Sequence, residues 1–393
     1  MAACGSRPSL TIALIGQKFM GRAHSNAWSQ AARFFNLPVQ PVLQTIAARD
    51  DASLKAFAER WGWKHCTTDW KSIAADDAID LVDIATPNNL HAEQAIAMLE
   101  AGKHVACEKP LARTLAEATA MAEAAATAPG KAFVWFNYRR CPAVALAHKL
   151  VREGRLGRIH HVRASYLQSW GGADTPMSWR FEKDRAGSGA HGELNAHVVD
   201  MARFITGDEI VNIHGAVART FITERLGEGG VKHPSDVDDA LLFLASFAGG
   251  AVASFEATRL ATGNLNANQI EINGDLGSLR FHFENMNVLE FYDADDQPRL
   301  DGWRRIMCTR EGEHPYAGNW WPDGHIIGYE HTFANMAADI TRVLAAQQPE
   351  VPLPDFADAL KTQRVLEAAM ISAQQQQAIA ISDLDEQPAT TQS

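Results

Sequence analysis

The sequence contains few cysteines, and none of them has the spacing of a structural zinc site. Five cysteines are spread along 393 residues, and no two form a C-x-x-C motif. Sparse thiols of this kind favour a reduced, cytoplasmic protein over one held together by disulfides. No apolar run approaches the roughly 18 residues of a membrane-spanning helix, and the first nine residues lack the apolar core of a signal peptide. We therefore expect a cytoplasmic protein with no membrane partner and no metal site.

Clusters of basic residues are also missing from the chain. The 36 Lys and Arg residues are outnumbered by 47 Asp and Glu residues, which gives a formal net charge of −11 at pH 7. This balance argues against a nucleic acid or an acidic membrane as partner. The hydrophobic content of 46% is ordinary for a soluble globular protein, and the length suggests two domains.

The first 140 residues alternate between short apolar runs and helical patterns. The expected strands cover 10–16, 42–48, 79–85, 103–107 and 133–136, and the expected helices cover 21–35, 52–61, 90–101 and 114–128. Strands alternating with helices of this length are typical of βαβ units and a parallel sheet. We expect an α/β Rossmann domain over residues 1–140, in which the strand at 103–107 ends just before Glu108, about where a fifth parallel strand should end.

The pattern changes after residue 140. A helix at 143–153 is followed by strands expected at 159–168, 210–222, 239–247, 250–260, 268–273, 277–283 and 287–292. Gly249 and Gly250 mark a hairpin turn between two of these strands. Residues 223–237 have the composition of a surface loop, and 355–380 are helical in pattern and expected to pack back on the first domain. We expect an α+β domain over 141–381 with a large, mostly antiparallel open sheet, then a flexible tail at 382–393.

A glycine-rich turn, Gly16 to Gly21, follows the first strand and opens a helix. The dinucleotide fingerprint G-x-G-x-x-G places a glycine in the middle, where the backbone approaches the pyrophosphate. Lys18 occupies that position here, and its ammonium group could attract phosphate instead. The alternative is a tight turn without a ligand. We expect Gly16, Lys18, Phe19 and Met20 to contact the cofactor.

The end of the second strand bears on the choice between NAD and NADP. An acidic residue there binds the ribose 2′-hydroxyl, whereas an arginine favours a 2′-phosphate. Ala48 occupies the usual position of the acid and Arg49 follows it, which leans towards NADP. Asp50 points the other way, because a shift of one residue would restore an acidic ribose ligand. An exposed charge pair in a loop is the plain alternative.

Two later turns should lie at the same edge of the sheet. Thr86-Pro87-Asn88-Asn89-Leu90-His91 follows the third recognisable strand, and Glu108-Lys109-Pro110 follows the next. Ligands of open α/β sheets bind at the carboxyl ends of the strands, so Lys109 is expected beside a nicotinamide ring. Helix capping competes with cofactor binding for Asn88, and a structural role is favoured over a catalytic one for His91. The cofactor-binding candidates here are Thr86, Asn88, His91, Glu108, Lys109 and Asn137.

Glu193, His197 and Asp200 form a further candidate group. On an α-helix, residues 193 and 197 share one face, and Asp200 lies near it. A carboxylate beside an imidazole fixes its tautomer, which suits acid–base work near neutral pH. A helix that buries a hydrogen-bonded histidine by chance is the alternative. The presence of Lys109 upstream favours the functional interpretation.

Together these motifs resemble the Gfo/Idh/MocA oxidoreductase family over nearly the whole chain. The matches are F-M-G-x-x-H at 19–24, T-P-N-x-x-H at 86–91, E-K-P at 108–110 and G-x-x-x-x-H-x-x-D at 192–200. The resemblance implies a Rossmann domain, a C-terminal α+β domain and an open sheet that joins subunits, hence a homodimer or homotetramer. It also implies that Lys109 and His197 flank the reacting carbon and that Glu193 completes a triad. The family usually has aspartate at that last position.

Within the family, the chain is most similar to sugar-oxidising members of the levoglucosan dehydrogenase type. The likeness is carried by Phe136–Arg140, Tyr166–Gln168 and Ser178–Phe181. Aromatic faces stack on pyranose rings, while Arg, Gln and Asn side chains bind hydroxyls. Core packing and a salt bridge are the alternatives for Trp179 and Arg180. The substrate-binding candidates are Tyr138, Arg139, Gln168, Trp179, Arg180, His197 and His325.

The resemblance implies an NAD(P)-dependent oxidoreductase that oxidises a secondary hydroxyl of a sugar, glycoside or anhydrosugar. His197 would be the general base, Glu193 would orient it, and Lys109 would support the developing alkoxide. One alternative is a glycoside-modifying enzyme that retains its cofactor and oxidises its substrate only transiently. The other is a non-catalytic sugar or nucleotide sensor, which should have lost the Lys109 and His197 pair.

Overall fold

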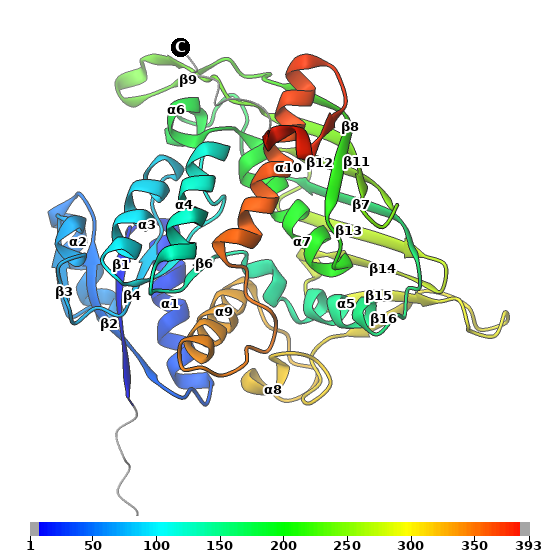
Figure 1. Cartoon of the computed structure of the whole chain (residues 1–393), viewed down its shortest axis with the longest axis horizontal. Helices are drawn as coiled ribbons and strands as arrows, with labels where there is room; N and C mark the ends of the chain where they lie inside the picture. The colour runs from blue at the N-terminus through cyan, green and yellow to red at the C-terminus, as the bar shows by residue number, and fades with distance from the viewer. Residues whose placement is uncertain (1–7, 386–393) are drawn as a thin grey trace, which may run out of the picture.

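A six-stranded parallel sheet forms the N-terminal half of the molecule in a computed structural model, which describes residues 8–385 (Figure 1). In spatial order its strands are β3 (His65–Thr67), β2 (Gln40–Ala47), β1 (Ser9–Ile15), β4 (Leu81–Ile84), β5 (His104–Cys107) and β6 (Ala132–Val134). This 3-2-1-4-5-6 order is that of a dinucleotide-binding Rossmann sheet. The expected fold class is confirmed, and the expected fifth strand does end before Glu108. Only the short strand β3 was missing from the prediction.

Apolar side chains explain why these strands form the centre of the domain. The last four residues of β1 and all four residues of β4 are buried, because helices cover both faces of the sheet. These helices are α1 (Phe19–Phe34), α2 (Asp51–Trp61), α3 (His91–Glu100) and α4 (Leu115–Thr127). Helices on both faces leave the carboxyl edge of the sheet as the place where loops can form a site.

A nine-stranded sheet forms the second half. Its order is β16 (Arg304–Met307), β15 (Val288–Asp293), β14 (Gly277–His282), β13 (Ala267–Gly274), β7 (Ile159–Leu167), β12 (Val252–Thr258), β11 (Ala240–Phe247), β8 (Ile210–Arg219) and β17 (Ile379–Ala380). Neighbouring strands are antiparallel except β7 and β12, which run parallel. One face of this sheet packs on α5 (Pro142–Arg152) and α7 (Ala196–Thr206). Along β11 buried and exposed residues alternate, as the expected half-open sheet requires.

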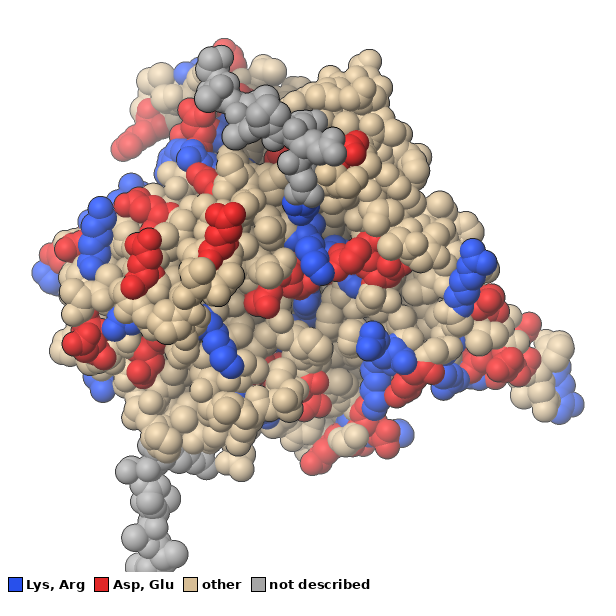
Figure 2. All heavy atoms as spheres, in the orientation of Figure 1, with Lys and Arg blue, Asp and Glu red and all other residues tan. Residues whose placement is uncertain are grey.

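The loop expected at 223–237 contains a short antiparallel ribbon instead. β9 (Glu224–Leu226) pairs with β10 (Lys232–Pro234). The two strands are only three residues long and largely exposed, so they give no apolar alternation from which strands could be predicted. On the face shown in Figure 2, acidic and basic side chains are interspersed and form no extended basic surface.

The C-terminal helices connect the two halves. Helix α9 (Tyr329–Leu344) packs against α1, and α10 (Phe356–Gln375) packs against both α4 and β8. The expected return of residues 355–380 to the first domain is therefore confirmed. Of the expected tail at 382–393, residues 382–385 belong to a 3₁₀ turn, η8 (Ile381–Asp385), and 386–393 lie outside the described residues.

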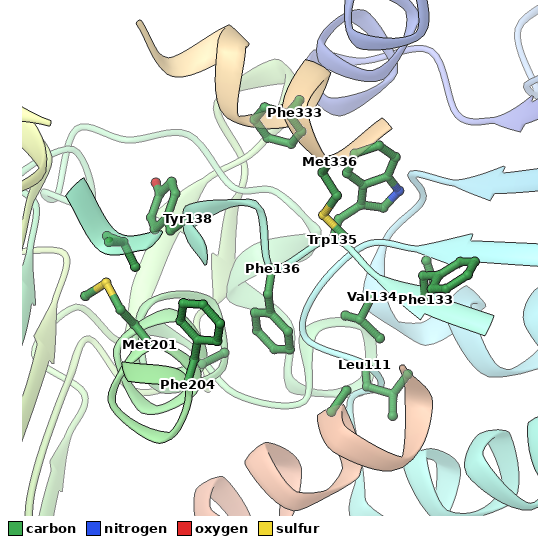
Figure 3. Packing of buried hydrophobic residues seen from close by; sticks show 14 of the residues in the cluster. Leu111, Phe133, Val134, Trp135, Phe136, Tyr138, Met201, Phe204, Phe333 and Met336 are labelled. Atoms are coloured by element: carbon green, nitrogen blue, oxygen red, sulfur yellow. The ribbon is translucent and has the colours of Figure 1, made fainter. Parts of the chain in front are cut away.

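A hydrophobic core fills the junction between the halves (Figure 3). Trp135 and Phe136 lie in the segment that leaves β6, next to Phe333 and Met336 of α9, with Phe204 of α7 beyond them. All five side chains are buried. Because this core spans both halves, it fixes the Rossmann edge relative to the residues of the second sheet.

Candidate active site

The first turn of the Rossmann edge is set by close backbone packing. Gly16 has φ +121°, and a Cβ there would lie 2.5 Å from the carbonyl oxygen of Ala85. A Cβ on Gly21 would lie 2.4 Å from the carbonyl oxygen of Gly16. Lys18, between them, has φ −74°, a value open to any residue. The turn therefore needs its first and last glycines but tolerates lysine in the middle.

The start of α1 suits the pyrophosphate of a dinucleotide. Within residues 8–385, no side chain caps this helix and its first turn carries no acidic residue. Free amide groups and the positive end of the helix dipole make such a terminus an anion site. Phe19 is about half exposed beside it. The residues present thus fit the phosphates of NAD, with the Lys18 ammonium as an additional cation.

The turn after β2 presents a fixed carboxylate. The Ser53 hydroxyl donates to Asp50 over 2.6 Å, and this hydrogen bond is the main reason that the pKa of Asp50 is lowered. The Gln17 amide donates to the Ser53 hydroxyl over 2.8 Å, which links this turn to the glycine-rich turn. Arg49 is exposed next to them. An ionised Asp50 at this place suits ribose hydroxyls and repels a 2′-phosphate.

The turn after β4 is built largely for structure. His91 is fully buried, and its ring nitrogens lie 3.0 and 3.1 Å from the carbonyl oxygens of Thr86 and Pro110. The expectation that His91 binds the cofactor is wrong, because both nitrogens already join two turns of the edge. Asn88 donates to the carbonyl oxygen of Ala186 over 2.9 Å, and the Thr86 hydroxyl donates to Gln94 over 2.7 Å.

Lys109 extends from the end of β5 towards the second half of the molecule. Its ammonium group donates to the backbone carbonyl oxygen of Glu193 over 2.9 Å. Burial lowers the pKa of Lys109, and the carboxylates of Glu193 and Glu108 partly counteract that effect. The contact brings together the two motifs that the sequence places 84 residues apart.

The carboxylate of Glu193 has other partners than the expected imidazole. It lies 3.0 Å from Nε of Arg180 and 2.7 Å from a terminal nitrogen of Arg259. Burial alone would raise the pKa of Glu193, but Arg259, Arg180 and Lys109 together lower it to about 2. The prediction that Glu193 orients His197 is therefore wrong.

Local helix geometry accounts for that error. Residues 191–195 (η5, His191–Asn195) form a π-helical turn, and α-helix begins only at Ala196. A π-helical turn is wider than an α-helical turn, so the α-helical spacing rule does not hold across it. Asp200 is likewise paired elsewhere, with Arg139.

His197 is buried and has a free ring nitrogen. Its Nδ1 has no hydrogen-bond partner among residues 8–385. The ring stacks on Tyr138 with centroids 4.3 Å apart, and Tyr166 lies 5.8 Å away. Burial, and then the charge of Lys109, hold the pKa of His197 well below 6.5, so the ring is neutral. A neutral imidazole next to a lysine can accept a proton from a hydroxyl group.

A hydrogen-bonded row of side chains continues from Tyr138 across the sheet. The Tyr138 and Tyr166 hydroxyls lie 2.8 Å apart, and Tyr166 donates to Asn266 over 2.6 Å. Gln168 donates to the same Asn266 oxygen over 2.8 Å. The indole of Trp170 donates to Gln168 over 2.6 Å. Tyr138 and Gln168 were expected in the substrate site, whereas Asn266 was not.

Arg259 is the main residue that sequence reasoning missed. Its side chain is 1% exposed, with the guanidinium 5.5 Å from the ring centroid of Phe181. It follows β12, whose last residue pairs in parallel with the last residue of β7 just before Gln168. Two parallel strands that end together would have indicated Arg259, but the sequence does not show that β7 and β12 are neighbours. Arg180 lies 4.6 Å from the ring centroid of Trp179 and forms the salt bridge that was its alternative role, with Glu193; its contact with the substrate stays a prediction.

Three other candidates lie outside this group. Arg139 is buried and paired with Asp200 and Asp358, which makes its expected role in substrate binding wrong. Asn137 is also buried and donates to the Thr332 hydroxyl over 2.7 Å, so it joins the segment after β6 to α9. His325 lies in an exposed turn with Nδ1 2.9 Å from the carbonyl oxygen of Pro322. Residue type alone does not show that Arg139 and Asn137 are buried against polar partners or that His325 lies in an exposed turn.

Among residues 8–385, no group of three or more His, Cys, Asp or Glu side chains could hold a metal ion. In the same range, no helix is long and apolar enough to cross a bilayer.

The chain matches known proteins over both halves. Residues 10–136 match an oxidoreductase family with an NAD-binding Rossmann fold, and residues 144–280 match the GFO/IDH/MocA C-terminal domain. The chain is 42% identical over 382 residues to levoglucosan dehydrogenase from Pseudarthrobacter phenanthrenivorans, covering 93% of this chain and 96% of that protein.

Solved structures agree with this assignment. An oxidoreductase domain protein from Kribbella flavida superposes with a TM-score of 0.92 at 50% identity, covering 95% of this chain and 99% of that one. A levoglucosan dehydrogenase in complex with NADH and L-sorbose gives a TM-score of 0.91 at 42% identity, with the same coverage. The chain therefore belongs to the Gfo/Idh/MocA family of NAD-binding oxidoreductases.

Proposed function

We propose that this protein is a sugar dehydrogenase that oxidises a secondary hydroxyl of a pyranose, glycoside or anhydrosugar with NAD. The observation that carries the proposal is a buried, neutral His197 that stacks on Tyr138 and whose pKa is lowered in part by the charge of Lys109. The 42% identity to levoglucosan dehydrogenase supports the substrate class.

His197 is the general base in this proposal. Its ring takes up the hydroxyl proton, and the stack on Tyr138 holds the ring in place. Lys109 donates a hydrogen bond to the same hydroxyl oxygen and stabilises the negative charge that develops there. When bound, NAD supplies the hydride acceptor, nicotinamide C4.

In this proposal Glu193 does not orient His197 but holds other side chains of the site. Its backbone oxygen receives the Lys109 ammonium, and its carboxylate holds Arg180 and Arg259. We propose that Arg180, Gln168 and Trp179 contact sugar hydroxyls and ring faces, with Tyr138 beneath them. These groups provide donors, acceptors and an aromatic face, as a pyranose requires.

NAD is the proposed cofactor, although Ala48 and Arg49 in the sequence favour NADP. The fixed, ionised Asp50 favours a free 2′-hydroxyl, and a related levoglucosan dehydrogenase has been solved with NADH. Gly16, Lys18, Phe19, Met20, Thr86 and Glu108 are the residues proposed to contact NAD.

The test is a panel of pyranosides, anhydrosugars and inositols, assayed with NAD and with NADP separately. Accumulation of NADH with excess NAD and one of these sugars is expected. No reduction of either cofactor by any sugar would overturn the proposal. Oxidation limited to one turnover per active site would favour the alternative in which the cofactor is retained.

We also propose that a second copy of the chain covers the outer face of the nine-stranded sheet. This face has a hollow of about 1090 Å³ and exposes Val217, Leu242 and Leu244. Exposed apolar groups of this kind mark interaction surfaces. Light scattering of the purified protein should give a homodimer or homotetramer, and Leu244→Lys should shift it towards the monomer. A monomeric wild-type protein would contradict the proposal.

A further inference from the structure

A chain of buried hydrogen bonds runs through the Rossmann half directly behind Lys109. His24 of α1 lies between two carboxylates, with Nδ1 2.8 Å from Asp83 and Nε2 2.9 Å from Glu108. Asp83 is in the middle of β4 and Glu108 follows β5. His24 and Asp83 are completely buried, and Glu108 is 4% exposed.

Every oxygen of the two acids has a donor. Asp83 also accepts from the indoles of Trp28 over 2.7 Å and Trp135 over 2.9 Å. The second oxygen of Glu108 accepts from the backbone amide of Lys109 over 3.0 Å. Buried carboxylates are tolerated only with such donors, since burying an unpaired charge is very costly. The chain of contacts therefore ends on the backbone of the proposed active-site lysine.

The glycine-rich turn makes this arrangement possible. Gly21 lets α1 approach the turn after β1, and His24 lies three residues further along the same helix. The imidazole can thus reach between β4 and β5, the two strands whose ends carry Thr86 and Lys109. The ring is packed against Trp135, with centroids 4.3 Å apart, and Phe333, with centroids 5.5 Å apart.

His24 is a cation in this environment. Burial alone would lower the pKa of His24, but Asp83 and Glu108 raise it to about 9. These two carboxylates are the titratable groups that contact the ring, which also packs on the aromatic rings of Trp135, in the segment after β6, and of Phe333 in α9. Both ring nitrogens therefore donate at neutral pH, one to each acid.

We propose that His24 is a positioning residue: held by Asp83, it fixes the Glu108 carboxylate, and Glu108 fixes the backbone of Lys109 and one side of the cofactor site. The inference rests on the proposed function for the role of Lys109. The effect of His24 on cofactor binding can be measured without any sugar. Misplacement of reacting groups by about 1 Å costs on the order of 100-fold in rate.

The test compares His24→Gln with Trp63→Phe in the intact protein. Trp63→Phe is the matched control, because it removes a buried hydrogen bond of 3.0 Å to Ser25, the residue next to His24 on α1. For His24→Gln we expect a fall in kcat of about 10- to 100-fold at saturating sugar, together with weaker NADH binding measured by fluorescence without sugar. Trp63→Phe should lower the melting temperature and leave kcat and NADH affinity unchanged.

A purely structural role for His24 makes a different prediction. Both variants would then lose stability alike, and the folded fraction of His24→Gln would keep the wild-type kcat and NADH affinity. That result would overturn the inference. If His24→Gln does not fold, Asp83→Asn is the deciding variant, because it keeps the packing and weakens the same series of hydrogen bonds. Wild-type kcat and NADH affinity in Asp83→Asn would also overturn the inference. Failure of the wild-type protein to oxidise any sugar would instead refute the proposed function and leave the NADH measurement intact.

Discussion

The ammonium group of Lys109 donates a hydrogen bond of 2.9 Å to the backbone carbonyl oxygen of Glu193. This contact joins the edge of the Rossmann sheet to the π-helical turn that precedes α7. Because the partner is a backbone atom, substitution of the Glu193 side chain need not remove it. Lys109 and Glu193 can therefore be examined separately by mutation.

Lys109→Met should abolish most of the activity while keeping the fold. The substitution retains the apolar stem and removes the ammonium group that stabilises the developing alkoxide, so kcat should fall by about 10²- to 10⁴-fold. Lys103→Met is the control, since Lys103 is a buried lysine at the opposite end of β5 whose ammonium donates to Asp76. Steady-state rates of NADH formation and melting curves distinguish the two. Equal loss of activity in both variants would contradict the catalytic role.

Glu193→Gln should weaken sugar binding and stability together. The change leaves Arg259, with a side chain only 1% exposed, without a counter-ion. Breaking a buried ion pair costs about 3–5 kcal/mol, and partial exposure of the Glu193 side chain places the loss at the lower end. Because the Glu193 charge raises the pKa of Lys109, that pKa should also fall.

Glu193→Asp is the informative comparison, because the family usually has aspartate here. One methylene less should lengthen the contact with Arg180 or Arg259, and we expect a higher KM for sugar with a smaller change in kcat. Urea unfolding and sugar-dependent kinetics measure both effects. A large fall in kcat at unchanged KM in either variant would restore the role that was first expected, orientation of His197.

The sequence predicted the Rossmann half well because its signals are local. Apolar runs, glycine turns and helix starts recur at short spacing, although the close packing that requires Gly16 comes from the carbonyl oxygen of Ala85 at the end of another strand. Lys109 could be placed because it follows such a run.

Residues whose role depends on distant partners could not be placed. Arg139 resembles a hydroxyl-binding side chain in sequence, yet Asp200 and Asp358 surround it in space. Asp83 was read only as part of an apolar strand, because its partners His24, Trp28 and Trp135 come from other segments. Glu193 and His197 have the spacing of one face of an α-helix, but Glu193 lies in a π-helical turn, where that spacing rule does not hold.

Arg139→Ala should affect stability far more than catalysis. The guanidinium is buried between α7 and α10, so its removal leaves Asp200 buried without its main partner. The free energy of unfolding should fall by about 3–5 kcal/mol. At a temperature where the variant is folded, KM for sugar should stay near the wild-type value. A KM raised at least about tenfold, equivalent to roughly 1.4 kcal/mol, would return Arg139 to the substrate site.

The stability of the protein should fall as the pH rises towards 9. His24 has a pKa raised from 6.5 to about 9 in the folded protein, so its contribution is fully present below pH 6.5 and is lost as pH rises through about 9. Linkage puts this contribution at a maximum of roughly 3 kcal/mol. The difference in unfolding free energy between the wild type and His24→Gln should therefore shrink across this interval. A constant difference would contradict a charged His24.

His197→Gln should lower kcat by about 10²- to 10⁴-fold, because the amide cannot take up the hydroxyl proton. In the wild type, the pKa of His197 lies well below 6.5, chiefly through burial and then through Lys109. The base is thus already neutral at pH 6.5, and the acidic fall in kcat/KM that reports the free enzyme's base should occur below that pH. His148→Gln is the control. His148 is a partly buried histidine of α5, outside the proposed site, and its Nδ1 lies 2.7 Å from the carbonyl oxygen of Phe204. An acidic limb centred at or above pH 6.5 would mean that His197 is not the base, or that substrate-free His197 has a charged partner.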